Sequence, residues 1–202
     1  FNTQLNASSW VEDVDYNITV SIDSTDDTNP SDNVFNSVMS LYTYCYPSMD
    51  CSFGDGLQNF TFVDINNDSG CEGYGDFISI STDVEQGGTY EMSFTTGYGD
   101  QYFRVWIDYD DNLIFSIDEL VIDNPVLASG SAAGSYTGNV EVSIDADAPL
   151  GSHLMRVKTN WNGAVPNDAC EETSYGETED YTLNIVESLG VQILDDTLVD
   201  IF

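Results

Sequence analysis

The stretch Tyr175-Gly176-Glu177-Thr178-Glu179-Asp180-Tyr181-Thr182-Leu183-Asn184-Ile185 places three carboxylates at the start of a predicted strand. From Tyr181 onward apolar and polar residues alternate, which is the period of a half-buried strand. Strands are normally depleted in Asp and Glu, because these side chains pack poorly on a pleated surface. The three acids therefore indicate a fixed structural or metal-related role.

Short runs of β-branched and aromatic residues recur along the whole chain, separated by clusters of Gly, Asn, Asp and Ser. They predict strands over residues 16–22, 57–63, 77–81, 89–95, 103–108, 119–122, 140–144, 153–159 and 180–186. Helical periodicity is almost absent. The pattern predicts an all-β fold, an antiparallel β-sandwich of the jelly-roll or immunoglobulin-like kind.

The three predicted parts of the chain differ in composition and in their content of predicted strands. Residues 1–40 hold one predicted strand and a polar stretch, and we interpret them as the tail of a preceding domain plus a linker, or as an extra strand laid on the main sandwich. Residues 41–187 form the predicted sandwich, and residues 188–202 a linker toward a following domain. The sequence shows no signal peptide or transmembrane run, so we expect a piece of a longer mature protein.

The charge of the chain is extreme, with 36 Asp and Glu against three Lys and Arg and a formal net charge of -33. The three basic residues are Arg104, Arg156 and Lys158. Such a surface repels nucleic acid and anionic membranes, so we expect neither as a direct partner. Divalent cations and basic protein surfaces are the natural counter-charges. The alternative is that the acids only keep the protein soluble in salt.

Four cysteines, Cys45, Cys51, Cys71 and Cys170, predict two disulfides in an oxidising compartment. A zinc site is not expected, because no two cysteines form a CxxC pair and His153 is the only histidine. Four cysteines allow three pairings, and their spacing alone does not choose among them.

The best candidate cation site is the loop over residues 108–119. Its oxygen ligands would be Asp108, Asp110, Asn112, the carbonyl of Ile114 and Glu119, a set that suits Ca²⁺. Leu113 stands where a calcium loop usually has glycine, so a different loop geometry is required. The alternative is an acidic hairpin turn without metal. Residues 64–68 repeat the pattern more weakly, and an ordinary turn is the favoured interpretation there.

The acids of the opening stretch should fall on two faces of the strand, Glu177 and Glu179 on one and Asp180 on the other. Arg156 lies on an otherwise apolar strand and is the natural partner for one of these acids. The alternative is that one acid completes a cation site with the 108–119 loop.

Catalysis finds little support, so we predict that the protein is not an enzyme. His153, the one histidine, lies at a strand start, where a structural role is favoured. The sequence contains no glycine-rich phosphate loop and no nucleophile elbow. Trp161, between two asparagines in a predicted loop, is a possible ligand-stacking residue.

The opening stretch resembles the signature of GEVED domains, secreted or cell-surface modules of Bacteroidetes, with Thr178 where that family usually has valine. Five other parts of the chain carry the same resemblance, namely residues 44–55, 65–71, 73–76, 105–110 and 155–157. The resemblance implies the disulfides Cys51–Cys71 and Cys45–Cys170, with Cys45–Cys51 as the main competing pair. It also implies export and a following sorting domain.

These observations favour a non-catalytic, extracellular β-sandwich module that acts in adhesion, spacing or assembly and is stabilised by Ca²⁺. Its partners would be neighbouring domains of the same polypeptide, with glycans or other surface proteins as further candidates. One alternative is a carbohydrate-binding accessory to a secreted polysaccharidase or protease. Another is a filament subunit in which residues 1–40 donate a strand to a neighbour.

Overall fold

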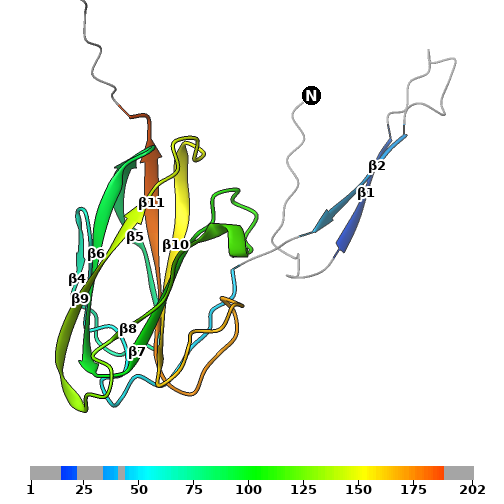
Figure 1. The fold of residues 1–202 in the computed structure, drawn as a ribbon. Coiled ribbons are helices and arrows are strands. Elements are labelled where there is room, and N and C mark those ends of the chain that lie inside the picture. The colour runs from blue at the N-terminus through cyan, green and yellow to red at the C-terminus, as the bar shows by residue number, and fades with distance from the viewer. Residues whose placement is uncertain (1–14, 22–33, 41–43, 189–202) are drawn as a thin grey trace, which may run out of the picture. The chain divides into compact units, whose positions relative to one another are not determined.

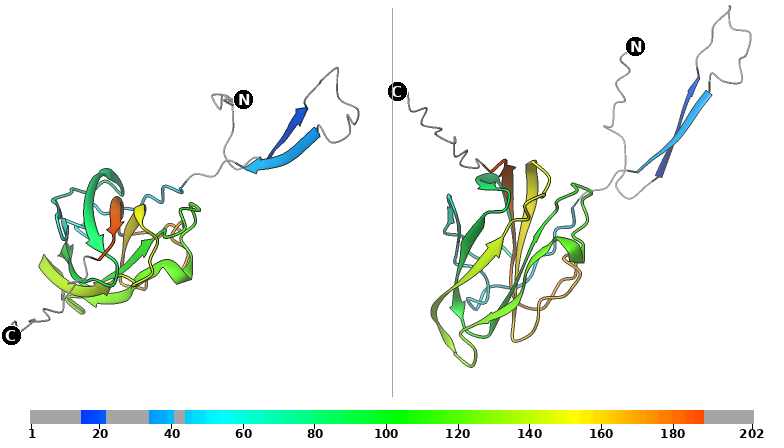
Figure 2. Two further views of the ribbon diagram at one scale, coloured as in Figure 1. Left: turned by 90° about the horizontal axis from the view of Figure 1, so that it is seen from above. Right: turned by 45° about the horizontal axis from the view of Figure 1, so that its top comes forward.

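Two β-sheets packed face to face form the main body of the protein in the computed structural model, which describes residues 15–21, 34–40 and 44–188 (Figure 1). One sheet has the strand order β5-β11-β10-β7-β8 and the other β4-β3-β6-β9. Figure 2 shows the two layers from two further directions. The predicted all-β sandwich with two disulfides is therefore confirmed.

The strands of the five-stranded sheet are β5 (Tyr74–Glu85), β7 (Gln101–Ile107), β8 (Leu120–Leu127), β10 (Gly151–Trp161) and β11 (Thr178–Val186). The four-stranded sheet contains β3 (Asn59–Phe62), β4 (Ile65–Asn67), β6 (Thr89–Tyr98) and β9 (Ala133–Ser143). One short 3-10 helix, η2 (Ile117–Glu119), precedes β8. No described helix is long and apolar enough to cross a membrane.

The core lies between the inner faces of the two sheets, and strand alternation decides which residues reach it. In β11, Tyr181, Leu183 and Ile185 are buried, while Thr182 and Asn184 between them are only partly buried. Met92 and Phe94 of β6 face them from the other sheet. Each large buried side chain contributes about 1.5–3 kcal/mol of hydrophobic stabilisation.

The five-stranded sheet is mixed, whereas the sequence predicted an antiparallel sandwich. β11 pairs in antiparallel fashion with β10 but runs parallel to β5. A parallel pair needs a long crossover between its strands. Here the segment from β6 to β10 forms that connection, and a local sequence pattern does not predict so long a crossover.

A separate two-stranded sheet pairs β1 (Asp15–Ser21) with β2 (Val34–Ser40), in antiparallel register from Asp15↔Ser40 to Ser21↔Val34. The chain divides into two compact units, Phe1–Cys45 and Tyr46–Phe202. The sequence predicted the first of these strands and missed the second. It also missed β4, which has only three residues.

Both disulfides follow the pairing that the resemblance implied. Cys51 and Cys71 are bonded to each other. Cys45 and Cys170 are also disulfide-bonded, and the four-cysteine chain leaves them only one another as partners. The competing pair Cys45–Cys51 was wrong.

Candidate functional site

The register of β11 separates the acids of the opening stretch onto the two faces of the sheet. Asp180 pairs with Arg156 of β10, and Glu179 pairs with Val157, which belongs to the core. Residues that are directly opposite in a sheet share a face. Asp180 therefore points to the outer face of the five-stranded sheet, and Glu177 and Glu179 point to its inner face.

On the outer face, Arg156 and Asp180 form a bidentate ion pair. Arg156 Nε and Nη2 donate to the two carboxylate oxygens of Asp180 at 2.8 and 2.7 Å. Both side chains are almost completely buried. The hydroxyl of Tyr74 donates to Asp180 at 2.8 Å, and the ring of Phe115 lies 4.7 Å from the guanidinium carbon. This geometry is typical of a strong structural pair.

The two other basic residues of the chain lie on the same outer face. Arg104 binds Asp123, with its Nη2 2.8 Å from the carboxylate, and also donates to Asn167. Lys158 donates to the carbonyls of Ala169 and Glu171. Burial, and then the nearby Arg156, lowers the pKa of Lys158 to about 8. Since the chain has only three Lys and Arg, none is left for the inner face.

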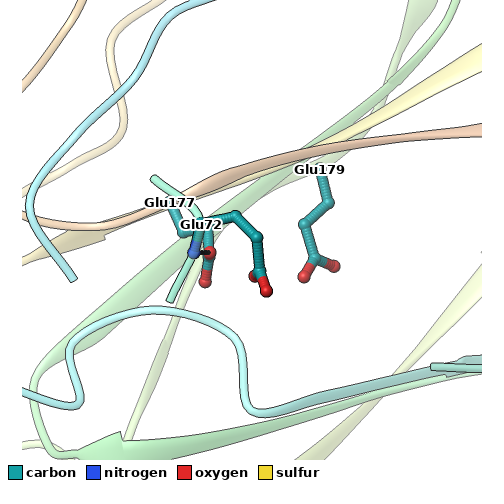
Figure 3. Close-up of side chains that lie close together, drawn as sticks. All are labelled: Glu72, Glu177 and Glu179. Atoms are coloured by element: carbon teal, nitrogen blue, oxygen red, sulfur yellow. Dashed lines mark hydrogen bonds between the residues drawn. The ribbon is translucent and has the colours of Figure 1, made fainter. Parts of the chain in front are cut away.

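On the inner face, Glu177 and Glu179 meet Glu72 at the end of the core. One carboxylate oxygen from each of the three lies within 4.8 Å of the others. Figure 3 shows the three carboxyl ends turned to the same side, with that of Glu72 between the other two. Glu177 and Glu179 are fully buried, whereas Glu72 is exposed. We call these three residues the glutamate cluster.

Hydrogen bonds fix two members of the glutamate cluster. Glu177 accepts the backbone N–H groups of Leu57 at 2.9 Å and of Glu72 at 2.8 Å. Glu179 accepts the Tyr181 hydroxyl at 2.6 Å with one oxygen. Its other oxygen, Oε1, is buried and has no hydrogen-bond partner among the described residues. Burial raises the pKa of both carboxyl groups, that of Glu179 to about 7.

The glycine that directly precedes Glu177 shapes the backbone at the entry to β11. Gly176 has a φ of +126°, a backbone conformation that is essentially reserved for glycine. A Cβ atom there would lie 2.3 Å from the carbonyl oxygen of Thr159. The glycine thus lets the chain turn closely past β10 before β11 begins.

The predicted calcium loop brings three of its five predicted ligands together. Carboxylate oxygens of Asp108, Asp110 and Glu119 lie within 4.8 Å of one another. Leu113 adopts a φ of +72° and so makes the turn that glycine usually makes, which corrects the expectation that its presence requires a different turn at this position. Asn112 accepts the N–H of Ile114 through its side-chain oxygen. The loop carboxylates accept backbone N–H groups, such as that of Leu113 to Asp108 at 3.0 Å.

The loop and the glutamate cluster are separate groups in the described residues, so the acids of β11 do not complete the loop site. The weaker 64–68 pattern contains a hairpin turn, since Phe62 of β3 pairs with Ile65 of β4. Asp68 there accepts a hydrogen bond from Asn59. The turn interpretation therefore accounts for that pattern.

His153 is buried at the start of β10, where the sequence placed it. Its Nδ1 lies 3.1 Å from Asp111 and 3.2 Å from the Asp108 carbonyl, and its Nε2 lies 3.0 Å from the Pro149 carbonyl. Both ring nitrogens thus contact groups of the protein, and the ring helps to fasten the 108–119 loop to β10.

Trp161, which the sequence placed in a loop, is the last residue of β10, and it lines a pocket of about 200 Å³. The other lining residues are Phe53, Asp55, Tyr98 and Tyr175. The Trp161 ring meets Tyr98 and Tyr175 edge to face, at centroid distances of 5.9 and 5.6 Å. Burial raises the pKa of Asp55. We call this the aromatic pocket.

Sequence reasoning found Trp161 but missed the rest of the aromatic pocket and also missed Glu72. These residues come from segments far apart in the chain, and Glu72 and Glu177 are 105 positions apart. The signal for Glu72 was its position directly after Cys71, whose bridge to Cys51 draws it toward the Glu177 carboxylate.

Comparisons with solved structures find only distant likenesses. A chitin binding domain from Burkholderia pseudomallei is 11% identical, with a TM-score of 0.36 over 52% of this chain and 57% of that chain. A family 123 glycoside hydrolase from Clostridium perfringens is 12% identical, with a TM-score of 0.30 over 57% of this chain and 23% of that one. These likenesses carry no argument about function.

The seventh ScaB type I cohesin from Pseudobacteroides cellulosolvens is 7% identical, with a TM-score of 0.26 over 56% of this chain and 93% of that chain. No curated protein matches the sequence. A family model does match, that of the GEVED domain, over residues 102–184. This segment runs from β7 through β11 and includes the acidic stretch from which the resemblance was drawn. Residues 102–184 are therefore identified as a match to the GEVED domain.

Proposed function

We propose that this chain is a non-catalytic binding module of a larger extracellular protein, and that the aromatic pocket holds a ring of a neutral sugar. The observation that carries the proposal is a single pocket lined by four aromatic residues and one buried carboxyl group, namely Trp161, Tyr98, Tyr175, Phe53 and Asp55. Binding to glycans would serve adhesion, or would direct neighbouring domains of the same polypeptide to a polysaccharide.

The chemistry of the pocket suits a sugar. An aromatic face carries negative π density, which attracts the weakly positive C–H groups on one face of a pyranose ring. A carboxylate such as that of Asp55 accepts hydrogen bonds from sugar hydroxyls. The pocket is smaller than the ~300–1,000 Å³ clefts that enclose drug-sized ligands, so it suits a single ring.

The charge of the protein favours a neutral ligand over an acidic one. A net charge of -33 repels uronic acids, sulfated sugars and phosphates before they reach the pocket. The two disulfides fit an oxidising, extracellular compartment, where polysaccharides are found. Display at a cell surface belongs to this proposal.

An array of neutral and acidic glycans tests the proposal. We expect saturable binding to at least one neutral glycan, and its loss in Trp161→Ala. Tyr136→Ala is the matched control, because Tyr136 is a half-buried aromatic of β9 that does not line the pocket. The proposal fails if no neutral glycan is bound, or if Trp161→Ala and Tyr136→Ala bind alike.

We also propose that Ca²⁺ binds the 108–119 loop and stabilises the module. The support is the approach of Asp108, Asp110 and Glu119, three residues that the spacing pattern had selected. The test is the melting temperature of the full chain in Ca²⁺ and in chelator. Asp110→Asn should abolish the part of the Ca²⁺-dependent rise that comes from the loop, and an undiminished rise in that variant would refute this part of the proposal.

A further inference from the structure

We propose that Glu72, Glu177 and Glu179 form a second cation site, distinct from the 108–119 loop, and that its ion is Ca²⁺. The site lies at the start of β11, on the inner face of the five-stranded sheet, where the loop that follows Cys71 reaches the strand.

The first argument is the unsatisfied oxygen of Glu179. Its Oε1 atom is buried and has no hydrogen-bond partner in the described chain. The whole Glu179 side chain is inaccessible to solvent, so water does not supply the missing hydrogen bond. The Ser69 hydroxyl donates to the Leu57 carbonyl at 3.1 Å and is also close enough to Glu179 to act on its carboxylate. A buried carboxylate oxygen without a partner is costly, and binding to an ion removes that cost.

The second argument is the lack of a basic partner. All three Lys and Arg side chains of the chain lie on the outer face of the sheet, where Asp123, Asp180 and backbone carbonyls surround them. Buried charges are normally paired or bound to a metal. The carboxylates of Glu177 and Glu179 therefore need either a proton or a cation from solution.

The third argument is geometry. Oxygens that bind one Ca²⁺ at 2.3–2.6 Å lie at most about 5 Å apart, and the cluster oxygens lie within 4.8 Å. Backbone N–H groups already hold two of the carboxylates in place, that of Leu57 on Glu177 and that of Gly70 on Glu72 at 3.1 Å. The ion would therefore meet ligands that are partly oriented in advance.

Solvent can reach the cluster from one side. Glu72 is exposed. An open cavity of about 530 Å³ is lined in part by Leu57 and Gly70, whose backbone N–H groups donate to Glu177 and Glu72, and by Ser69. Water from this side would complete the six to eight oxygens that Ca²⁺ takes. The ion would join the loop beside the Cys51–Cys71 bridge to β11.

The test measures Ca²⁺ binding to the full chain by calorimetry after treatment with a chelator. All samples carry Asp110→Asn, so that the cluster is measured apart from the 108–119 loop. We expect one Ca²⁺ per chain in this background. Adding Glu179→Gln should abolish binding, and adding Glu72→Gln should weaken it at least tenfold, because each change removes a charged ligand.

Glu91→Gln serves as the control, since Glu91 is an exposed carboxylate of β6 outside the cluster. It should leave Ca²⁺ affinity unchanged. Glu72 is also exposed, so Glu72→Gln remains informative if Glu179→Gln does not fold. Absence of Ca²⁺ binding in the Asp110→Asn chain overturns the proposal. Equal affinity with and without Glu72→Gln also overturns it.

Discussion

At the scale of single residues, the Arg156–Asp180 pair should contribute most visibly to stability. Both partners are buried, so Asp180→Asn removes the charged carboxylate that accepts two hydrogen bonds from the buried guanidinium. We expect a loss of about 3–5 kcal/mol in the free energy of unfolding, measured with urea. Asp123→Asn is the control, because the Asp123 side chain is 64% exposed, so water can replace its carboxylate beside Arg104 and the loss should be clearly smaller. Similar losses in the two variants would contradict this account of the outer face.

Lys158 gives a prediction about pH. Its pKa is about 8 in the folded protein and 10.5 in its ordinary state, so between these values unfolding takes up a proton. The stability that Lys158 contributes should therefore rise with pH from about 8 to 10.5, by at most about 3 kcal/mol. The measurement is urea unfolding of wild type and Lys158→Met at pH 7.5 and 10. A constant difference between the two proteins at both pH values would show that the lysine pKa is not lowered.

At the scale of elements, Gly176 sets the point at which β11 begins. Gly176→Ala should cost at least ~3 kcal/mol, because a Cβ there meets the Thr159 carbonyl and φ is +126°. Gly130→Ala is the matched control, since Gly130 also has a positive φ, +72°, but a Cβ there would meet nothing within 4 Å. We expect a cost of about 1–2 kcal/mol in the control. Equal losses, measured by thermal or urea unfolding, would mean that the close approach to Thr159 is unimportant.

The alternation of apolar and polar residues predicted the individual strands well. In a strand with one face on the core, every second side chain is buried and therefore apolar. The run Tyr181, Leu183, Ile185 is the plainest case, and it also placed Glu179 and Asp180 on opposite faces. Alternation does not predict which distant strands pair with each other, as β5 and β11 do. The glutamate cluster needs that long-range arrangement, because Glu72 meets Glu177 only after the fold has formed. For the same reason, Trp161 was the only lining residue of the aromatic pocket that the sequence predicted.

At the scale of the whole molecule, the sandwich should fold without residues 1–43, which include β1 and β2. β1 and β2 pair only with each other in the described sheets, and the core consists of residues from Leu57 to Ile185. Deleting residues 1–43 keeps Cys45, and we expect urea unfolding of the sandwich to be unchanged. Size-exclusion chromatography of both chains tests the filament alternative, in which residues 1–40 donate a strand. A shift from assembled to monomeric protein on deletion would favour that alternative.

The most direct test of the sugar-binding claim follows the indole N–H signals of ¹⁵N-labelled protein by NMR, as neutral mono- and oligosaccharides are titrated in. Trp161 lines the aromatic pocket, whereas Trp106 is completely buried in β7 and serves as an internal reference. The account predicts a saturable shift of the Trp161 signal with a neutral sugar, while the Trp106 signal stays in place. Saturable sugar binding that leaves the Trp161 signal unmoved would contradict it, as would the absence of binding by every neutral sugar.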